Sequence, residues 1–340
     1  MSADSITGLA DLPTSTERRP SLLRAEVRRF RSRRFVRVML LLAVVGYVVA
    51  VVIMASQYAK PSPEGLVEAR QRVEQLVVEQ NQFRAECLTT VPADASPDDY
   101  CGPVATVANF GDLSNFLPRQ AFVLKDIGPD AATGFGVGVA ALFFLIGATW
   151  IGAEWSSKNL ASWLTWEPRR LRVMAAKVTV LGVAAAIVAA MAQLAWLGTA
   201  WFLASTRGIT DVPVDFWGEL WALQGRLVVF AVLAAVGGFA LANLTHNTGA
   251  ALGIAFLYVA VLETAVRALE PSWQRFLLSD NALGFLQPRG LTIQWYDEES
   301  FMDRPHEVFI SHWGGGLTVG VAVLVVLAVG VALFHRRDIT

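Results

Sequence analysis

The sequence predicts an all-α integral membrane protein with six transmembrane helices. Hydrophobic residues make up 54% of the 340, charged residues make up 17%, and the mean hydropathy is +0.46, outside the usual range of soluble domains. A bilayer core about 30 Å thick requires roughly 20 apolar residues in a helix. Six apolar stretches meet this requirement, at residues 38 to 56, 133 to 153, 173 to 204, 222 to 242, 249 to 269 and 314 to 334.

The segment before the first stretch divides into two parts. Residues 1 to 20 are rich in Ser, Thr, Pro and Asp, which is typical of a disordered tail. Residues 21 to 37 predict a basic amphipathic helix in the headgroup layer, where anionic lipid attracts arginine. Its apolar stripe is Leu23, Val27 and Phe30, and its basic stripe is Arg24, Arg28 and Arg31. A purely topogenic charge cluster is the alternative, and a nucleic-acid partner is not expected.

Basic residues gather at three places that one topology puts on the same side. They run from Arg18 to Arg37, recur from Lys158 to Lys177, and return at Arg336 and Arg337. The positive-inside rule therefore predicts that both termini are cytoplasmic. No clean cleavage pattern ends the first span, so we expect it to be retained rather than removed as a signal peptide.

Two polar regions, residues 57 to 132 and 270 to 313, then face the outside. The first contains both cysteines, Cys87 and Cys101, and an oxidising compartment favours a disulfide between them over two free thiols. Closing a loop of roughly 15 residues contributes about 3 kcal/mol in the chain-entropy model. Apolar residues at helical spacing between Pro63 and Cys87 predict an amphipathic helix in the same region.

A charged, tryptophan-rich hairpin at residues 154 to 172 joins the second and third stretches. Ser156 or Ser157 is suited to cap a short helix, and the Glu-Pro step at 167 and 168 ends it. We interpret the hairpin as a docking surface for a cytoplasmic partner, with membrane anchoring as the alternative. Its candidate contact residues are Glu154, Trp155, Lys158, Leu160, Trp163, Leu164, Trp166, Glu167, Pro168, Arg169 and Arg170.

Polar side chains within the apolar stretches are functional candidates because burying them in lipid is expensive. Gln193 could bond a neighbouring helix, and Arg226 could extend its head toward the interface. Glu263 and Arg267 are spaced for an intrahelical ion pair. Glycines at 134, 136, 138, 237 and 238 permit close helix contacts, within the chain or at a dimer seam.

The sequence predicts no enzymatic activity for this chain. A Gly-x-x-x-x-Gly-Lys-Ser/Thr loop is missing, and the cytoplasmic segments are too short for a nucleotide-binding domain. The four histidines are scattered along the chain, so no metal site is predicted.

Three segments resemble the permease subunits of bacterial type-2 ABC exporters, especially those of actinobacteria. They are RAEVRRFRSRRF at 24 to 35, GAEWSSKNLASWLTWEPRR at 152 to 170, and FHRRD at 334 to 338. The resemblance covers the whole membrane portion, and it makes residues 38 to 340 one permease domain in a bacterial plasma membrane. It also implies re-entrant helices from Trp273 to Phe285.

By this resemblance, the hairpin is the coupling helix, which sits in a groove of a separate ATPase subunit that binds ATP and Mg. A second permease copy or a paralogue would complete the assembly. The first outer region is larger than a minimal family member needs. A membrane sensor or assembly scaffold, with an outer loop that binds a ligand, remains the alternative function.

Overall fold

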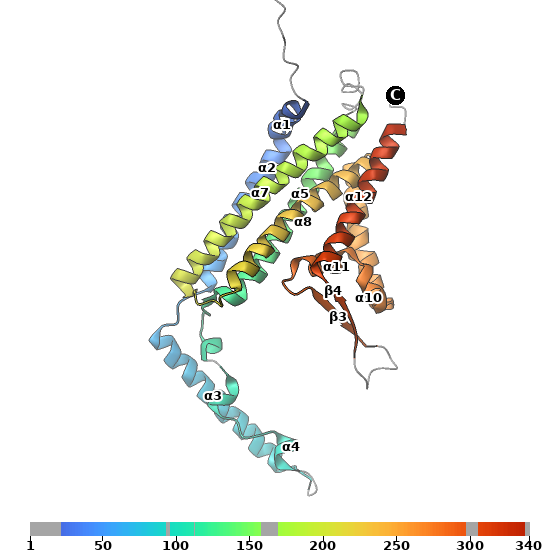
Figure 1. Ribbon diagram of the computed structural model, residues 1–340. Coiled ribbons are helices and arrows are strands. Elements are labelled where there is room, and N and C mark those ends of the chain that lie inside the picture. The colour runs from blue at the N-terminus through green and yellow to red at the C-terminus, as the bar shows by residue number, and fades with distance from the viewer. Residues whose placement is uncertain (1–21, 93–95, 112, 158–168, 297–304, 337–340) are drawn as a thin grey trace, which may run out of the picture.

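The computed structural model describes residues 22–92, 96–111, 113–157, 169–296 and 305–336 (Figure 1). Within them, six helical segments are long and apolar enough to cross a membrane, which confirms the predicted number. They are α2 (Arg34–Gln57), α5 (Leu124–Ser156), α7 (Arg170–Arg207), α8 (Phe216–Thr245), the composite segment Thr248–Leu269, and α12 (His312–Arg336).

Helix α5 begins nine residues before the predicted span. Its first turns are buried through Leu124, Gly128 and Ala132, which pack near the start of α8. Pro129 lies in the second turn, where it cannot donate the usual helical hydrogen bond to the carbonyl of Lys125. Tertiary packing therefore lengthens this helix beyond the stretch that lipid alone requires.

The fifth span is composite. It consists of α9 (Thr248–Phe256), a π-helical segment η3 (Leu257–Leu262) and α10 (Glu263–Leu269). Asn247 caps α9 by accepting the N–H of Ala250 at 3.1 Å. A π-helical insertion offsets the helix face by one residue and often marks a functional position.

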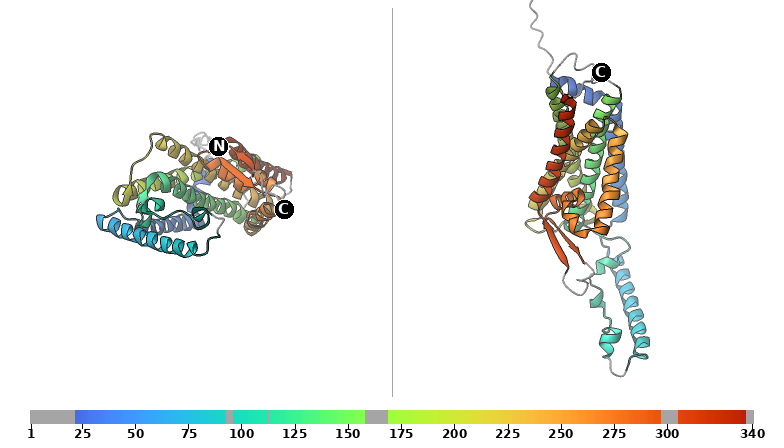
Figure 2. Two further views of the ribbon diagram at one scale, coloured as in Figure 1. Left: turned by 90° about the horizontal axis from the view of Figure 1, so that it is seen from below. Right: turned by 90° about the vertical axis from the view of Figure 1, so that its right-hand side faces the viewer.

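Helix α1 (Leu22–Ser32) lies at the end of the bundle where α5 finishes, α7 begins and α12 finishes (Figure 1). Helix α3 (Pro63–Leu88) extends away from the opposite end, together with α4 (Pro97–Cys101), η1 (Val107–Phe110) and η2 (Leu113–Phe116) (Figure 2). We refer to these as the α1 end and the α3 end.

The predicted helix between Pro63 and Cys87 is confirmed as α3. Ser62 caps it by accepting the N–H of Gly65 at 3.0 Å, and Pro63 occupies the first turn. Ala69 and Val73 are buried in α3, which packs against η2, whereas Phe83 is 74% exposed. Cys87 and Cys101 form the predicted disulfide, which joins α3 to α4.

Two short helices and a hairpin connect the fifth and sixth spans. The helices are η4 (Pro271–Phe276) and α11 (Leu278–Leu286), and α11 packs against α12. Strands β3 (Leu291–Trp295) and β4 (His306–Ile310) pair antiparallel. Alternation in these segments buries Ile293 and Ile310 and exposes their neighbours, so the all-α prediction missed a local strand pattern. A second, parallel pair joins β1 (Phe122–Val123) to β2 (Gly208–Ile209).

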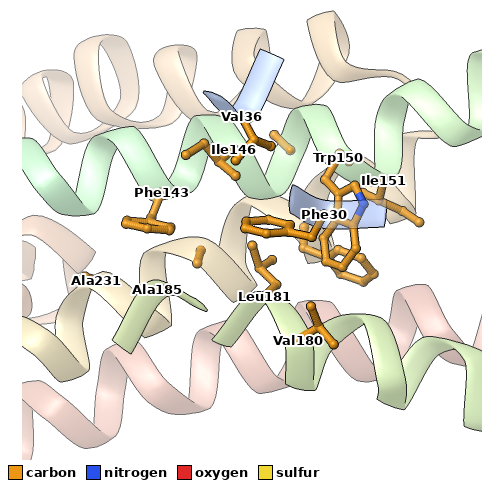
Figure 3. Close-up of a cluster of buried hydrophobic side chains, with 14 of the residues drawn as sticks. Phe30, Val36, Phe143, Ile146, Trp150, Ile151, Val180, Leu181, Ala185 and Ala231 are labelled. Carbon is orange, nitrogen blue, oxygen red and sulfur yellow. The ribbon is translucent and has the colours of Figure 1, made fainter. Parts of the chain in front are cut away.

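The core of the bundle is the interface between α5 and α8, which α7 covers. Large apolar side chains from α1, α5 and α7 converge at its α1 end, where Phe30 lies close to Trp150 and Leu181 (Figure 3). Two glycines let the helix backbones approach. A Cβ on Gly147 would overlap the carbonyl oxygen of Ala235, and one on Gly238 would overlap that of Phe144.

The predicted glycine contacts therefore lie partly within the chain. We expect Gly147→Ala and Gly238→Ala to destabilise the fold by about 1–3 kcal/mol each, because the rigid backbones must separate. Gly134→Ala and Gly138→Ala are matched controls, since no heavy atom lies within 4 Å of an added Cβ. Thermal unfolding of detergent-purified variants measures the difference, and equal midpoints for all four would contradict this packing.

Candidate functional site

The predicted docking hairpin connects the end of α5 to the start of α7. Seven of its candidate residues lie outside the described residues: Lys158, Leu160, Trp163, Leu164, Trp166, Glu167 and Pro168. The structure describes its flanks. The hydroxyls of Ser156 and Ser157 both donate to the carbonyl of Ala153, so they close the last turn of α5.

Glu154, in the last turn of α5, pairs with Lys177, which lies two turns into α7. The distance from Lys177 Nζ to Glu154 Oε2 is 2.8 Å, and both side chains are 1% exposed. This ion pair joins the two helices on either side of the hairpin. Glu154 was predicted to contact a partner, but its burial means that it faces into the chain instead.

Lys177 also binds Glu26 of α1. Its Nζ lies 3.1 Å from each carboxylate oxygen of Glu26, whose side chain is fully buried. One ammonium group thus bridges carboxylates from helices α1 and α5 while belonging to α7. Three segments distant in the sequence meet at this charge.

Two arginines also contact these carboxylates. Arg33 Nη2 lies 2.7 Å from Glu154 Oε1, and Arg33 Nη1 donates to the carbonyl oxygen of Trp150 at 3.1 Å. Arg29 Nη1 lies 3.9 Å from an oxygen of both Glu26 and Glu154. Two carboxylates and three cations therefore form a connected group, which we call the charge cluster: Glu26, Arg29, Arg33, Glu154 and Lys177.

Aromatic side chains pack against the charge cluster. Trp150 is 1% exposed, and Lys177 Nζ lies 5.3 Å from its ring centroid. Phe30 meets Trp150 edge to face with a centroid distance of 5.1 Å. This apolar cover lowers the local dielectric, so each ion pair is stronger and each unpaired charge is more costly than at the surface.

The other described hairpin residues anchor α5 and α7 to the far side of the bundle. Trp155 Nε1 donates to Asn243 Oδ1 of α8 at 3.2 Å, and its ring packs edge to face on Phe334 of α12. Arg170 donates to the carbonyl oxygen of Phe334 at 3.0 Å. Trp155 and Arg170 therefore make contacts within the chain, which favours the anchoring alternative for these two positions. Arg169 is exposed just before α7.

The three residues of the predicted apolar stripe of α1 differ in burial. Phe30 is buried in the chain, whereas Leu23 and Val27 are 48% and 42% exposed. The residues of this segment that contact α5 and α7 are Glu26 and Phe30 of α1 and Arg33, which directly follows α1. Arg24, Arg28 and Arg31 are all exposed.

The predicted Glu263–Arg267 ion pair is confirmed at 3.3 Å and belongs to a larger network. Arg267 also binds Asp280 of α11 at 2.9 Å. Glu263 is fully buried, accepts the N–H of Ser279 at 3.1 Å, and accepts the Ser279 hydroxyl. Span five thus holds the first turn of α11 in place, as a capping residue would.

The remaining intramembrane candidates occupy separate places. Gln193 is 3% exposed, and its amide nitrogen lies against Gly136 at the α5–α7 contact. Its Oε1 is buried without a hydrogen-bond partner among the described residues, so the predicted bond to a neighbouring helix is not seen. Arg226 is half-buried on α8, one turn beyond the exposed Trp221. The structure does not bring either residue into the charge cluster.

Sequence reasoning missed four members of the charge cluster. The sequence assigned no role to Glu26, included Arg29 and Arg33 only in the basic run from Arg18 to Arg37, and used Lys177 only as a basic residue of the predicted cytoplasmic side. A signal was available for Lys177, because it falls inside the third predicted span, where a lone charge needs a partner. No signal of this kind marks Glu26, which lies outside every span.

Comparison of the chain with protein-family models, curated proteins and solved structures finds no match.

The charge cluster makes a direct stability prediction. Lys177→Met should lower stability by about 3–5 kcal/mol, because two buried carboxylates lose their shared ammonium partner while the side-chain volume is kept. Arg70→Met is the control, since it breaks an exposed 3.0 Å pair with Glu74, worth about 0–1 kcal/mol. Chemical unfolding of both variants measures the change in the free energy of unfolding. Equal decreases for the two variants would contradict the prediction that the buried ion pairs contribute more than an exposed one.

Proposed function

We propose that this chain is the membrane-spanning permease subunit of an ATP-driven ABC exporter, with ATP hydrolysis in a separate subunit. The observation that supports this most is the charge cluster. It ties α1, α5 and α7 together on the flanks of the residues that the resemblance identifies as a coupling helix. A partner that pushed on this connection would displace three helices together.

The proposal requires a connection that transmits force instead of absorbing it. A push on the hairpin meets α5 and α7, which Lys177 and Glu154 hold together at 2.8 Å. Trp155 and Arg170 extend the contact to α12 through Phe334. Movement of the hairpin would then become rigid-body displacement of the bundle end, which is a common form of coupled transition.

The chain sequence has no phosphate-binding loop, so ATP and Mg are assigned to the partner ATPase. We assign the α1 end to the cytoplasm of a bacterial plasma membrane, because its exposed arginines obey the positive-inside rule. A homodimer or a pair with a paralogue would cover the apolar side chains that α2, the fifth span and α12 expose. In an apolar stretch of 18 residues from each of these segments, 0%, 11% and 17% of the residues are buried within the chain.

The helices that extend from the α3 end of the bundle favour a second candidate function, a membrane sensor or scaffold. Helices α3 and α4, joined by the Cys87–Cys101 disulfide, extend beyond the bundle (Figure 2). In the proposed orientation they would offer a stable surface outside the membrane. A phosphate-binding-loop ATPase that co-purifies with the chain from native membranes would support transport. A kinase in its place would support sensing.

Topology can be tested with single cysteines introduced beside the native disulfide. Gln294→Cys lies on β3 near the α3 end, and Ser32→Cys lies at the α1 end. We expect an impermeant maleimide to label position 294 but not position 32 in intact cells, and both after permeabilisation. Labelling of position 32 from outside would reverse the proposed orientation.

Coupling can be tested at Trp163, which the resemblance makes the apolar anchor of the coupling helix. Trp163→Ala should weaken binding of the ATPase subunit about 30-fold, equivalent to roughly 2 kcal/mol for a buried aromatic anchor. Trp313→Ala is the matched control, because Trp313 is 82% exposed at the start of α12 on the opposite end. Binding is measured between the two purified subunits in nanodiscs.

The transport proposal fails if Trp163→Ala binds the ATPase as tightly as the parent and keeps normal ATP-coupled transport. Glu154 is unsuitable for this test. Its replacement would disturb the charge cluster and therefore the fold.

A further inference from the structure

The contacts that α1 and Arg33 make with α5 and α7 fix the rotation of α1 about its own axis. Glu26 binds Lys177, Phe30 packs on Trp150, and Arg33 binds Glu154. Glu26 and Phe30 lie one turn apart on the same face of α1, and Arg33 directly follows the helix. Turning the helix by one residue would take Glu26 out of reach of its cation. The surface that α1 presents outward is therefore equally well determined.

The acidic side chain of this segment faces the interior of the chain. Glu26 is the one acidic residue between positions 22 and 37, and it is fully buried against Lys177. Arg29 and Arg33 face the two buried carboxylates, as described above. The other basic residues of the segment are all exposed: Arg24, Arg28, Arg31, Arg34 and Arg37. The outward surface from 22 to 37 therefore carries positive charge and no carboxylate.

An apolar stripe adjoins the basic one. Leu23 and Val27 are 48% and 42% exposed between the buried stripe and the arginines. Helix α1 lies across the end of the bundle, and the membrane span α2 begins at Arg34, two residues after α1 ends (Figure 2). A helix beside a span, with adjacent basic and apolar stripes, matches the depth at which headgroups give way to acyl chains.

We propose that the outer face of α1 is a binding surface for anionic phospholipid. Arg28 and Arg31 contact the phosphate and the negatively charged headgroup, while Leu23 and Val27 enter the upper part of the acyl layer. The apolar stripe distinguishes a lipid from other phosphate ligands, because RNA and free phosphate offer nothing for exposed Leu and Val to pack on. This inference does not depend on the proposed function.

The surface has a structural consequence for the charge cluster. Lipid bound to Arg28 and Arg31 holds α1 from outside, while Glu26 and Phe30 hold it from inside. Anionic lipid therefore stabilises the same helix that meets α5 and α7 at Lys177. The lipid composition of the leaflet at the α1 end would set how firmly these helices are joined.

The test uses the full chain in detergent, titrated with phosphatidylglycerol or phosphatidylcholine and analysed by intact-complex mass spectrometry. We expect phosphatidylglycerol to bind more tightly, with an affinity that falls as salt increases. The variant Arg28→Gln/Arg31→Gln should weaken phosphatidylglycerol binding by about fivefold per arginine, the fold-change that corresponds to about 1 kcal/mol each. Arg28→Lys/Arg31→Lys should retain most of the affinity because it retains the charge.

The matched control is Arg70→Gln/Arg119→Gln, which removes two exposed arginines at the α3 end. It should leave phosphatidylglycerol binding unchanged. Equal binding of the two lipids by the parent chain would overturn the proposal, as would equal loss in the control and the α1 variant. An RNA oligonucleotide that binds more tightly than phosphatidylglycerol would identify the surface as a nucleic-acid site and also overturn it.

Discussion

Lys177 is the constraint on which the α1 end of this protein depends. A buried ammonium group is unstable without anionic partners, and two buried carboxylates in proximity are unstable without a cation. Helices α1, α5 and α7 supply Glu26, Glu154 and Lys177. None of the three helices can therefore move away without leaving an uncompensated charge in apolar surroundings. The arrangement specifies which helices meet and at which turn. It does so more sharply than apolar packing would, because an apolar face tolerates sliding.

The α3 end is organised by the same physical rule with different residues. Glu263 is fully buried in the fifth span, where it pairs with Arg267 and accepts the N–H of Ser279 in the first turn of α11. Arg267 also binds Asp280 of α11. Between the two polar networks, α5 and α8 approach closely through Gly147 and Gly238. Each end of the bundle is therefore held by a defined set of polar contacts, and the middle of the bundle is held by close packing of α5 on α8. Displacement at one end would pass along α5 and α8 as a body, which is what the proposed permease requires.

The spans and the disulfide could be predicted because their signals are local. Run length identifies an apolar helix, and a pair of cysteines in an outer region favours one bond. The inward face of α1 could not be predicted this way, because Glu26 finds its partner 151 residues away in sequence. Helical spacing grouped Leu23, Val27 and Phe30 into one apolar stripe, but only Phe30 is buried, on the side of α1 where Glu26 binds Lys177. Glu154 was assigned to a partner surface for the same reason. A charged residue in a polar hairpin is expected to be exposed, and its partner Lys177 could not be identified from local sequence. The β3–β4 hairpin was missed within a loop that was read only for its polarity.

The most direct test of this account measures hydrogen–deuterium exchange of the α1 amides in the parent chain, in Glu26→Gln, in Lys177→Met and in the double variant. If the charge cluster holds α1 to α5 and α7, each single replacement should speed exchange across residues 22 to 32 and leave α3 protected. The α1 amides of the double variant should exchange no faster than those of the less stable single variant, because the two side chains belong to one interaction. Unchanged exchange in α1, or strictly additive losses, would contradict the claim that this ion pair holds the helix in place.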